Sequence, residues 1–198
     1  GTFFEENRVH TEYDQLPPHL VQALVATEDE RFYDHAGIDF RSLGRALASF
    51  GTQGGGSTLT QQLAKQMFHQ PASSKAGRVL QKFKEWIIAL QLESRYTKDE
   101  IIALYFNQFD FLYQAVGVHS ASRIYFGKNP QQLTVPEAAV LVGMVKNPSI
   151  YNPVRRLEET TARRNTVLRQ MERNGYLTEE EYTAFAATPL EVRFNPQT

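Results

Sequence analysis

The sequence predicts an all-α fold, one helical domain divided into a large and a small lobe, and three observations support this. Apolar residues recur with helical spacing along most of the chain, most clearly over residues 74–95. The capping-box pattern, a threonine followed three residues later by glutamate, occurs at Thr97, Thr134 and Thr178. Only PLEVRF at 189–194 alternates like a strand. At most a short hairpin near the termini is therefore expected.

Helix start and stop signals place the elements in order. Pro17-Pro18 opens a helix, Asp39 and Ser57 are expected N-caps, and Gly175 is an expected stop. GTQGGG at 51–56 is expected to be a loop. The expected helices are 18–29, 40–50, 58–68, 74–95, 99–107, 138–145, 156–174 and 178–187. The expected organisation is an extended segment at 1–15, a domain at 16–187, and the start of a linker to a further domain at 188–198.

Composition excludes several classes of function. The 198 residues carry a formal net charge of -1, so bulk charge gives no indication of nucleic acid binding. The chain has no cysteine, which excludes disulfides, thiolate nucleophiles and thiolate metal ligands. Its five histidines lack the spacing of a zinc site. No apolar run reaches the roughly 18 residues that a membrane-spanning helix needs.

Ionisable side chains crowd the segment EDERFYDHAG, which contains Glu28, Asp29, Glu30, Asp34 and His35. The first two fall at the C-terminal end of the helix expected at 18–29, where the helix dipole disfavours negative charge. A carboxylate held in such a place can serve as a general base. A solvated acidic turn explains the same cluster, so this segment alone does not decide between the two.

A second polar group opens the helix expected at 58–68. GGGSTLTQQLAKQ places Ser57, Gln61, Gln62 and Lys65 at the helix start, and Gln61 and Lys65 share a face because they are four residues apart. Backbone amides at a helix start, together with a lysine, suit an anion such as a phosphate. Any glycine-rich loop before a helix could produce the same pattern.

Together the two segments resemble the first two signature motifs of the peptidoglycan glycosyltransferases, the N-terminal catalytic domains of class A penicillin-binding proteins. The first motif is matched by Glu28, Asp29, Phe32, His35 and Gly37, and the second by Gly55, Ser57, Thr58, Gln61, Gln62 and Lys65. Three further motifs are matched by Lys82 and Glu85, by Lys98, Ile101, Tyr105 and Asn107, and by Arg163, Arg164, Asn165, Val167 and Leu168. The resemblance covers about residues 16–182 and implies a lysozyme-like, two-lobed helical fold.

Two positions depart from the family pattern. Gln81 stands where the third motif has an arginine, and Arg78 lies three residues earlier on the same expected helix. Residues 109–118 differ from the family's glycine-containing turn.

The resemblance implies that the enzyme polymerises lipid II into β-1,4-linked glycan by inverting transfer from an undecaprenyl-pyrophosphate donor. Glu28 is the expected general base toward the acceptor hydroxyl, and Glu85 the expected catalytic carboxylate on the donor side. The expected substrate-binding residues are Asp29, Ser57, Gln61, Gln62, Lys65, Lys82, Asn107, Arg163 and Arg164. His35 is expected to be a structural hydrogen-bonding residue.

The same chemistry sets the expected cofactors and partners. No organic cofactor and no protein metal ligands are expected, while Mg²⁺ or Mn²⁺ can accompany the donor pyrophosphate. The expected partners are lipid II, the growing glycan chain, the membrane surface and cell-wall synthesis proteins, with no nucleic acid. The expected location is the outer face of the bacterial cytoplasmic membrane, through peripheral contact. The candidate membrane contacts are Phe106, Phe109, Phe111, Leu112 and Tyr113, with Met67 and Phe68, although ordinary core packing is the favoured interpretation for at least half of these positions.

Two other readings stay open. A lysozyme-like lytic enzyme would share a helical fold and one essential glutamate, but cleavage of a neutral glycosidic bond does not need the polar and basic residues at 61–65. A non-catalytic helical scaffold or inactive relative is the other alternative, and Gln81 in place of the motif arginine keeps it open. A transpeptidase within this chain is excluded, because no serine is followed three residues later by lysine.

Overall fold

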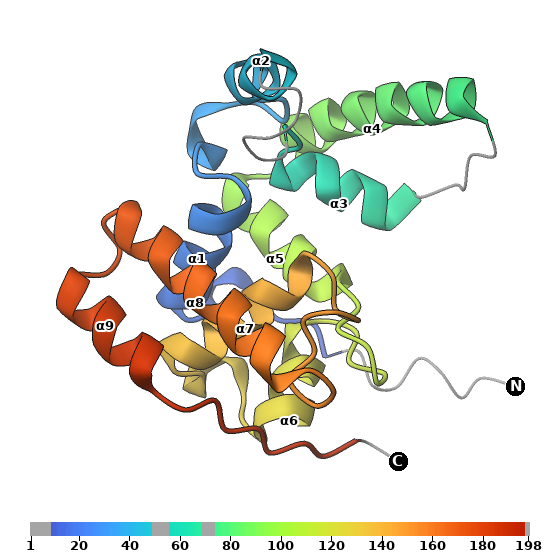
Figure 1. Ribbon diagram of the computed structural model, residues 1–198. Coiled ribbons are helices and arrows are strands. Elements are labelled where there is room, and N and C mark those ends of the chain that lie inside the picture. The colour runs from blue at the N-terminus through green and yellow to red at the C-terminus, as the bar shows by residue number, and fades with distance from the viewer. Residues whose placement is uncertain (1–8, 49–55, 69–73, 197–198) are drawn as a thin grey trace, which may run out of the picture. The chain divides into compact units, whose positions relative to one another are not determined.

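The computed structural model describes residues 9–48, 56–68 and 74–196, and within these ranges the regular structure is helical, without a strand (Figure 1). The α-helices are α1 (Pro18–Glu28), α2 (Phe40–Ala48), α3 (Leu59–Phe68), α4 (Lys75–Arg95), α5 (Lys98–Gln108), α6 (Val118–Phe126), α7 (Val135–Val145), α8 (Leu157–Arg173) and α9 (Glu179–Ala187). Three 3₁₀ turns are η1 (Tyr13–Gln15), η2 (Phe32–Asp34) and η3 (Pro130–Gln132). The all-α prediction is confirmed.

The chain divides into two compact units. Unit 1 consists of residues 1–30 and 109–198, and unit 2 of residues 31–108. Glu28 and the arginines of α8 therefore belong to unit 1. The polar residues of α3 and α4 belong to unit 2.

Unit 1 is built around α7. This helix is buried along almost its whole length and packs against α1, α6, α8 and α9. Its start is fixed as the sequence predicts, because the Thr134 side chain accepts from the Glu137 amide while the Glu137 carboxylate accepts from the Thr134 amide. The same reciprocal pair forms between Thr178 and Glu181 at the start of α9. A rigid α7 gives α1 and α8 a common surface to pack on.

Unit 2 is built on α3, which packs against α4 and α5. Asp39 caps α2 as predicted, since its Oδ1 accepts from the Arg41 amide at 3.0 Å and the Ser42 amide at 3.2 Å. The cap of α3 differs from the prediction by one residue. Thr58, and not Ser57, accepts from the Gln61 amide at 3.1 Å, and the Gln61 side chain accepts from the Thr58 amide at 2.9 Å.

Other sequence predictions need correction. Residues 189–194 form no strand; instead the Arg193 amide donates to the Tyr125 carbonyl, and the Phe194 ring lies 5.1 Å from the Tyr113 ring. The segment expected to begin a linker is therefore packed on unit 1. Helix α6 was not predicted. Of the loop expected at 51–56 and the extended segment expected at 1–15, residues 51–55 and 1–8 lie outside the described residues.

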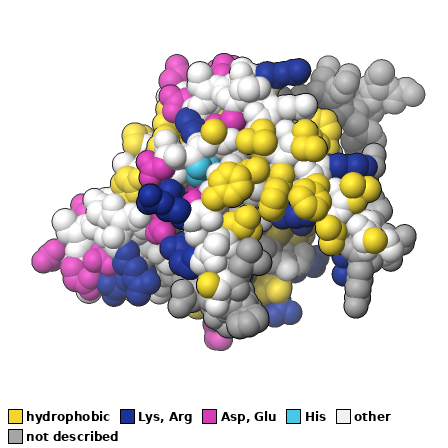
Figure 2. All heavy atoms as spheres, turned by 90° about the horizontal axis from the view of Figure 1, so that it is seen from above, with side chains coloured by type: hydrophobic (Ala, Val, Ile, Leu, Met, Phe, Trp, Pro, Cys, Tyr) yellow, Lys and Arg dark blue, Asp and Glu magenta, His cyan; other side chains and the backbone are white. Residues whose placement is uncertain are grey.

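The exposed apolar surface lies elsewhere than the sequence suggested. Phe106 and Phe111 are fully buried, so they are core residues and cannot contact a membrane, while Phe109, Leu112 and Tyr113 are partly buried. Met67 and Phe68 are exposed, as expected. The larger apolar surface belongs to α4, where Val79, Leu80, Phe83, Ile87 and Leu90 are each 47–58% exposed. Figure 2 shows hydrophobic side chains gathered on one face of the molecule, with lysine or arginine side chains around them. None of the described helices is long and apolar enough to span a membrane.

Candidate active site

Glu28 is the last residue of α1 and is held at the end of a well-packed helix. Pro18 fixes the helix start, and Leu20, Leu24 and Val25 anchor the helix in the core of unit 1. The Glu28 Oε1 lies 3.6 Å from a terminal nitrogen of Arg163. The two side chains are 15% and 13% exposed. This pair is thus a partly buried carboxylate whose orientation is set by a guanidinium on α8.

Arg163 is itself held from several sides. Its Nε donates to the Gly143 carbonyl at 3.4 Å, and its guanidinium lies 5.7 Å from the centre of the Tyr151 ring. The Lys146 ammonium lies 6.0 Å from the same ring. A Cβ at position 143 would lie 3.0 Å from the Arg163 Cγ, so glycine is what allows α7 and the arginine to approach this closely.

Unit 2 contains a separate group of predicted site residues at the start of α3 and along α4. The Lys82 ammonium donates to the Ser57 hydroxyl at 2.9 Å and to the Glu85 Oε2 at 3.2 Å. Glu85 is buried, whereas Lys82 remains 44% exposed. The structure therefore brings Ser57, Lys82 and Glu85 together as a polar cluster with an accessible ammonium.

The glutamines and lysine of α3 have different surroundings. Gln61 is buried and its Oε1 caps the helix, so this oxygen has a structural role, and substrate binding by Gln61 stays a prediction. The Gln62 Oε1 accepts from the Tyr105 hydroxyl at 2.9 Å, which fixes the Gln62 side chain against α5. Lys65, one turn further on, is exposed. The sequence could have shown the role of Gln61, because Thr followed three residues later by Gln is itself a capping box.

A buried ionic network joins the motif segments of unit 2. The Lys98 ammonium donates to the His35 carbonyl at 2.6 Å and to the Glu93 Oε1 at 2.8 Å. The Thr60 hydroxyl donates to the same Glu93 oxygen at 2.7 Å. The Lys98 ammonium also lies 4.3 Å from the Phe32 ring centre. His35 is structural as expected in one respect, since its Nδ1 accepts from the Gly37 amide at 3.1 Å.

Arg164 is the clearest correction. Its guanidinium is 1% exposed and donates to the carbonyls of Thr188 at 2.7 Å and Ala186 at 3.0 Å, where α9 ends. These bonds satisfy carbonyls that a helix end leaves without partners. Arg164 is therefore committed to the structure of unit 1, and the prediction that it binds substrate is wrong.

The remaining predicted residues lie on α1, α4 and α5. Asp29 is the buried C-cap of α1. The Asn107 side-chain amide donates to the Ala103 carbonyl at 2.7 Å, one turn back on α5. Gln81 and Arg78 lie on α4, and Arg78 is exposed. Among the described residues, no group of three or more His, Asp and Glu is placed to hold a metal ion.

Sequence reasoning missed the residues that hold the functional side chains. Gly143 and Tyr151 contact Arg163, and Glu93 accepts from Lys98. No sequence pattern marks these three residues as partners of the motif residues. The burial of Arg164 was readable, because it is in helical phase with buried Thr160, Leu168 and Met171 on α8. Helical phase does not separate Arg163 from Arg164, because Arg163 is itself in phase with buried Thr160 and Val167.

Comparison with known proteins identifies relatives along nearly the whole chain. The family model described as transglycosylase matches residues 1–172. Penicillin-binding protein 1A of Escherichia coli (strain K12) is 42% identical over 182 residues, which cover 90% of this chain and 21% of that protein. Penicillin-binding protein 1B of Vibrio cholerae is 42% identical over 201 residues, which cover 97% of this chain and 25% of that protein.

A solved structure agrees with these relatives. The 2.6 Å crystal structure of penicillin-binding protein 1A from Haemophilus influenzae matches with a TM-score of 0.57 and 25% sequence identity, covering 93% of this chain and 18% of that one. The chain thus spans about a fifth to a quarter of the length of the curated relatives it matches.

Proposed function

Since the chain belongs to the transglycosylase family, we propose that it is a peptidoglycan glycosyltransferase that polymerises lipid II into β-1,4-linked glycan strands. The observation that carries the proposal is the Glu28–Arg163 pair, a carboxylate held at a helix end and oriented by a guanidinium. The donor is an α-linked glycosyl pyrophosphate and the product is β-linked. One displacement with inversion therefore suffices.

Glu28 is the general base in this proposal. The sugar hydroxyl of the acceptor is a weak nucleophile, and a positioned base that takes its proton accelerates such a step by about 10²–10⁴-fold. Arg163 acts as a positioning residue, because its contacts with Gly143 and Tyr151 fix the guanidinium that faces Glu28. Asp29 is proposed to contact substrate beside Glu28.

The leaving pyrophosphate needs positive charge more than a proton. The exposed ammonium of Lys82, held between Ser57 and Glu85, supplies that charge, and Lys65 adds a second cation. Gln62 and Asn107 are proposed to hydrogen-bond to the substrate. Glu85 keeps the ammonium in place and is the proposed donor-side carboxylate. A divalent cation would bind through the phosphates of the substrate.

The membrane surface is the proposed setting, since the donor is lipid-linked. The exposed apolar face of α4, together with Met67 and Phe68 at the end of α3, supports this placement. These residues take the role of membrane contact that the sequence assigned to the 106–111 segment, where Phe106 and Phe111 are buried. We expect this face to rest in the headgroup region at the outer side of the cytoplasmic membrane.

Polymerisation of purified lipid II in bilayers, followed by gel separation of glycan strands, tests the proposal. Glu28→Gln keeps the shape of the side chain and should lower the rate by about 100-fold or more while lipid II binding persists. Glu30→Gln, two residues away and exposed, is the matched control and should keep its rate. A Glu28→Gln enzyme that polymerises at the wild-type rate would show that Glu28 is not the general base.

Further arms of the same assay separate the alternatives. Shortening of finished glycan by the wild-type chain, without any polymer from lipid II, would establish the lytic reading. Lipid II binding with no turnover in any bilayer would establish the scaffold reading. A rate that a chelator abolishes and Mg²⁺ or Mn²⁺ restores would place a divalent cation on the donor pyrophosphate.

A further inference from the structure

Unit 2 contains a pocket that the proposed reaction does not use. Its volume is about 320 Å³. The turn after α1, the first turn of α2 and the later part of α4 form its walls, with lining residues Arg31, Asp34, His35, Ala36, Ile38, Asp39, Phe40, Arg41 and Leu90. Glu85, Ser57 and Lys82 are not among the lining residues. Its function therefore has to be argued separately.

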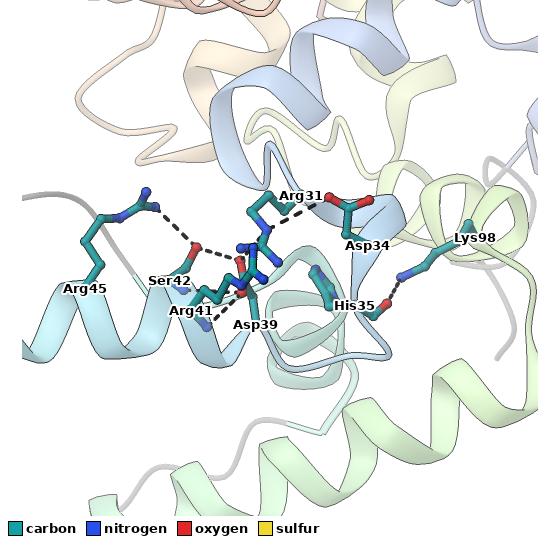
Figure 3. Close-up of polar contacts among 8 residues, drawn as sticks. All are labelled: Arg31, Asp34, His35, Asp39, Arg41, Ser42, Arg45 and Lys98. Atoms are coloured by element: carbon teal, nitrogen blue, oxygen red, sulfur yellow. Dashed lines mark hydrogen bonds and ion pairs between the residues drawn. The ribbon is translucent and has the colours of Figure 1, made fainter.

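The polar wall of the pocket is built around Asp39. Its carboxylate is buried, caps α2 through two backbone amides and the Ser42 hydroxyl, and lies 3.7 Å from the Arg31 Nε (Figure 3). Burial alone would raise the pKa of this carboxyl, but the bonds from Ser42, the charge of Arg31 and the Arg41 amide together lower it. Asp39 therefore holds Arg31 toward the pocket as a fixed cation.

The pocket has more positive than negative charge around it. Arg31 and Arg41 line it, and Arg45 follows Arg41 by one helical turn and donates to the Ser42 hydroxyl at 3.2 Å. The acidic groups are Asp39, which is occupied by the helix cap, and Asp34, whose exposed carboxylate lies 4.0 Å from the Arg31 Nε. The lining itself is therefore balanced, with two guanidinium groups against two carboxylates that both lie near Arg31. Arg45, outside the lining, adds a third guanidinium beside Arg41, and these two neighbouring arginines at the edge of the pocket suit an anion.

The rim of the pocket is apolar. Phe40 is 71% exposed and Leu90 is 47% exposed, and both line the pocket. Leu90 also belongs to the exposed apolar face of α4, one turn from Ile87 and two from Phe83. Figure 2 shows charged side chains of both signs and a histidine bordering the hydrophobic patch. A pocket lined by two arginines therefore opens directly onto an apolar surface.

We propose that this pocket binds the anionic phosphodiester headgroup of a membrane phospholipid, with Arg31 and Arg41 on the phosphate and the acyl chains along Phe40 and Leu90. The combination of arginines and apolar residues in the lining favours a phospholipid over a soluble anion. A soluble anion would use the arginines but would leave the apolar rim in water, whereas a phospholipid matches both parts. The inference rests on the membrane setting of the proposed function and deepens it.

Flotation of the full chain with vesicles tests the site without any turnover. The vesicles contain either phosphatidylcholine alone or phosphatidylcholine mixed with phosphatidylglycerol. Any lysine or arginine close to an anionic membrane surface raises the affinity for that membrane by about fivefold, whether or not it contacts a lipid headgroup. Arg95→Ala, which removes an exposed cation of the same unit outside the pocket, therefore sets the non-specific level. Arg41→Ala should lose about tenfold or more, because it also loses charge-assisted bonds to the phosphate.

A charge-neutral variant makes the test sharper. Ala36 is exposed and lines the pocket, so Ala36→Phe fills the pocket without changing any charge. It should abolish the preference for phosphatidylglycerol while binding to phosphatidylcholine persists. An unchanged preference in Ala36→Phe, or equal losses in Arg41→Ala and Arg95→Ala, would overturn the headgroup site and leave the membrane setting intact.

Two further results are decisive. If inorganic phosphate binds the chain without vesicles and Ala36→Phe removes that binding but leaves the phosphatidylglycerol preference unchanged, the site is one for free phosphate and the lipid proposal fails. If the wild-type chain floats with neither kind of vesicle, the membrane part of the proposed function fails as well. Polymerisation of detergent-solubilised lipid II by the same preparation keeps the enzymatic proposal separate from both.

Discussion

Neighbouring arginines on α8 should respond to mutation in opposite ways. Arg164 is enclosed in unit 1 and donates to the carbonyls of Ala186 and Thr188 and to the Asn165 side chain, so Arg164→Ala removes both carbonyl bonds and a third bond to Asn165, and leaves a cavity. Arg163 faces Glu28 near the surface of the same unit, so Arg163→Ala leaves the packing of α8 largely intact. The first change should therefore destabilise the fold, and the second should slow the reaction.

The magnitudes follow from the bonds. Each hydrogen bond from a charged group contributes about 1.5–3 kcal/mol, so Arg164→Ala should lower the free energy of unfolding by about 3–5 kcal/mol. Burial already lowers the pKa of Arg164, which means that its charge is costly unless both carbonyls are present. For a domain of this size the melting temperature should fall by roughly 10 °C. Arg163→Ala should cost about 1 kcal/mol of stability but tenfold or more in rate, because the base loses its orientation.

Thermal unfolding and lipid II polymerisation, measured on both variants, check this pair of expectations. Arg164→Lys is the matched control, since it keeps the charge but cannot donate to two carbonyls in a fork, and should fall between wild type and alanine in melting temperature. An Arg164→Ala protein that melts like the wild type but does not polymerise would refute the reasoning. That result would indicate that Arg164 binds substrate and does not stabilise the fold.

Three other expectations test separate features. Gly143→Ala should lower the polymerisation rate severalfold with little change in melting temperature, because the new methyl group displaces Arg163 while alanine favours the helix by about 1 kcal/mol. Asp39→Asn should cost about 1 kcal/mol near neutral pH. Since the folded pKa of Asp39 is lowered, its charge stabilises the fold above about pH 4 and that gain disappears as pH falls further, so urea titrations of both proteins should converge in acid. Gln114 has φ +64°, so Gln114→Gly should melt no lower than wild type and Gln114→Val about 1 kcal/mol lower in calorimetry.

Helix positions were predictable because their signals are local. The capping boxes at Thr97, Thr134 and Thr178 all form, and Asp39 caps α2 as expected. Helix α6 was missed for the same reason, since its N-cap is Gly117 and no side chain marks its start. The segment 189–194 alternates like a strand but has no strand partner among the described residues, and it packs on α6 instead.

The site was predictable residue by residue but not contact by contact. Motif spacing identified Glu28, Ser57, Lys82 and Glu85, yet it could not show that Lys82 lies between the other two members of its cluster. Motif spacing also did not show that the Gln61 oxygen caps α3, although the local capping-box pattern of Thr58 and Gln61 could have indicated it.

The periodicity of α4 shows what a sequence leaves undecided. The buried residues of this helix are Glu85, Ala89 and Leu92, whereas the large apolar residues, including Phe83 and Ile87, are exposed. Residues two apart on a helix point in nearly opposite directions, so the core of unit 2 takes one stripe and the apolar stripe is left outside. Periodicity reveals that a helix has an apolar face but not what covers it. A face of this size is unfavourable in water, which is why a lipid surface, and a headgroup pocket at its edge, is the consistent reading of both features.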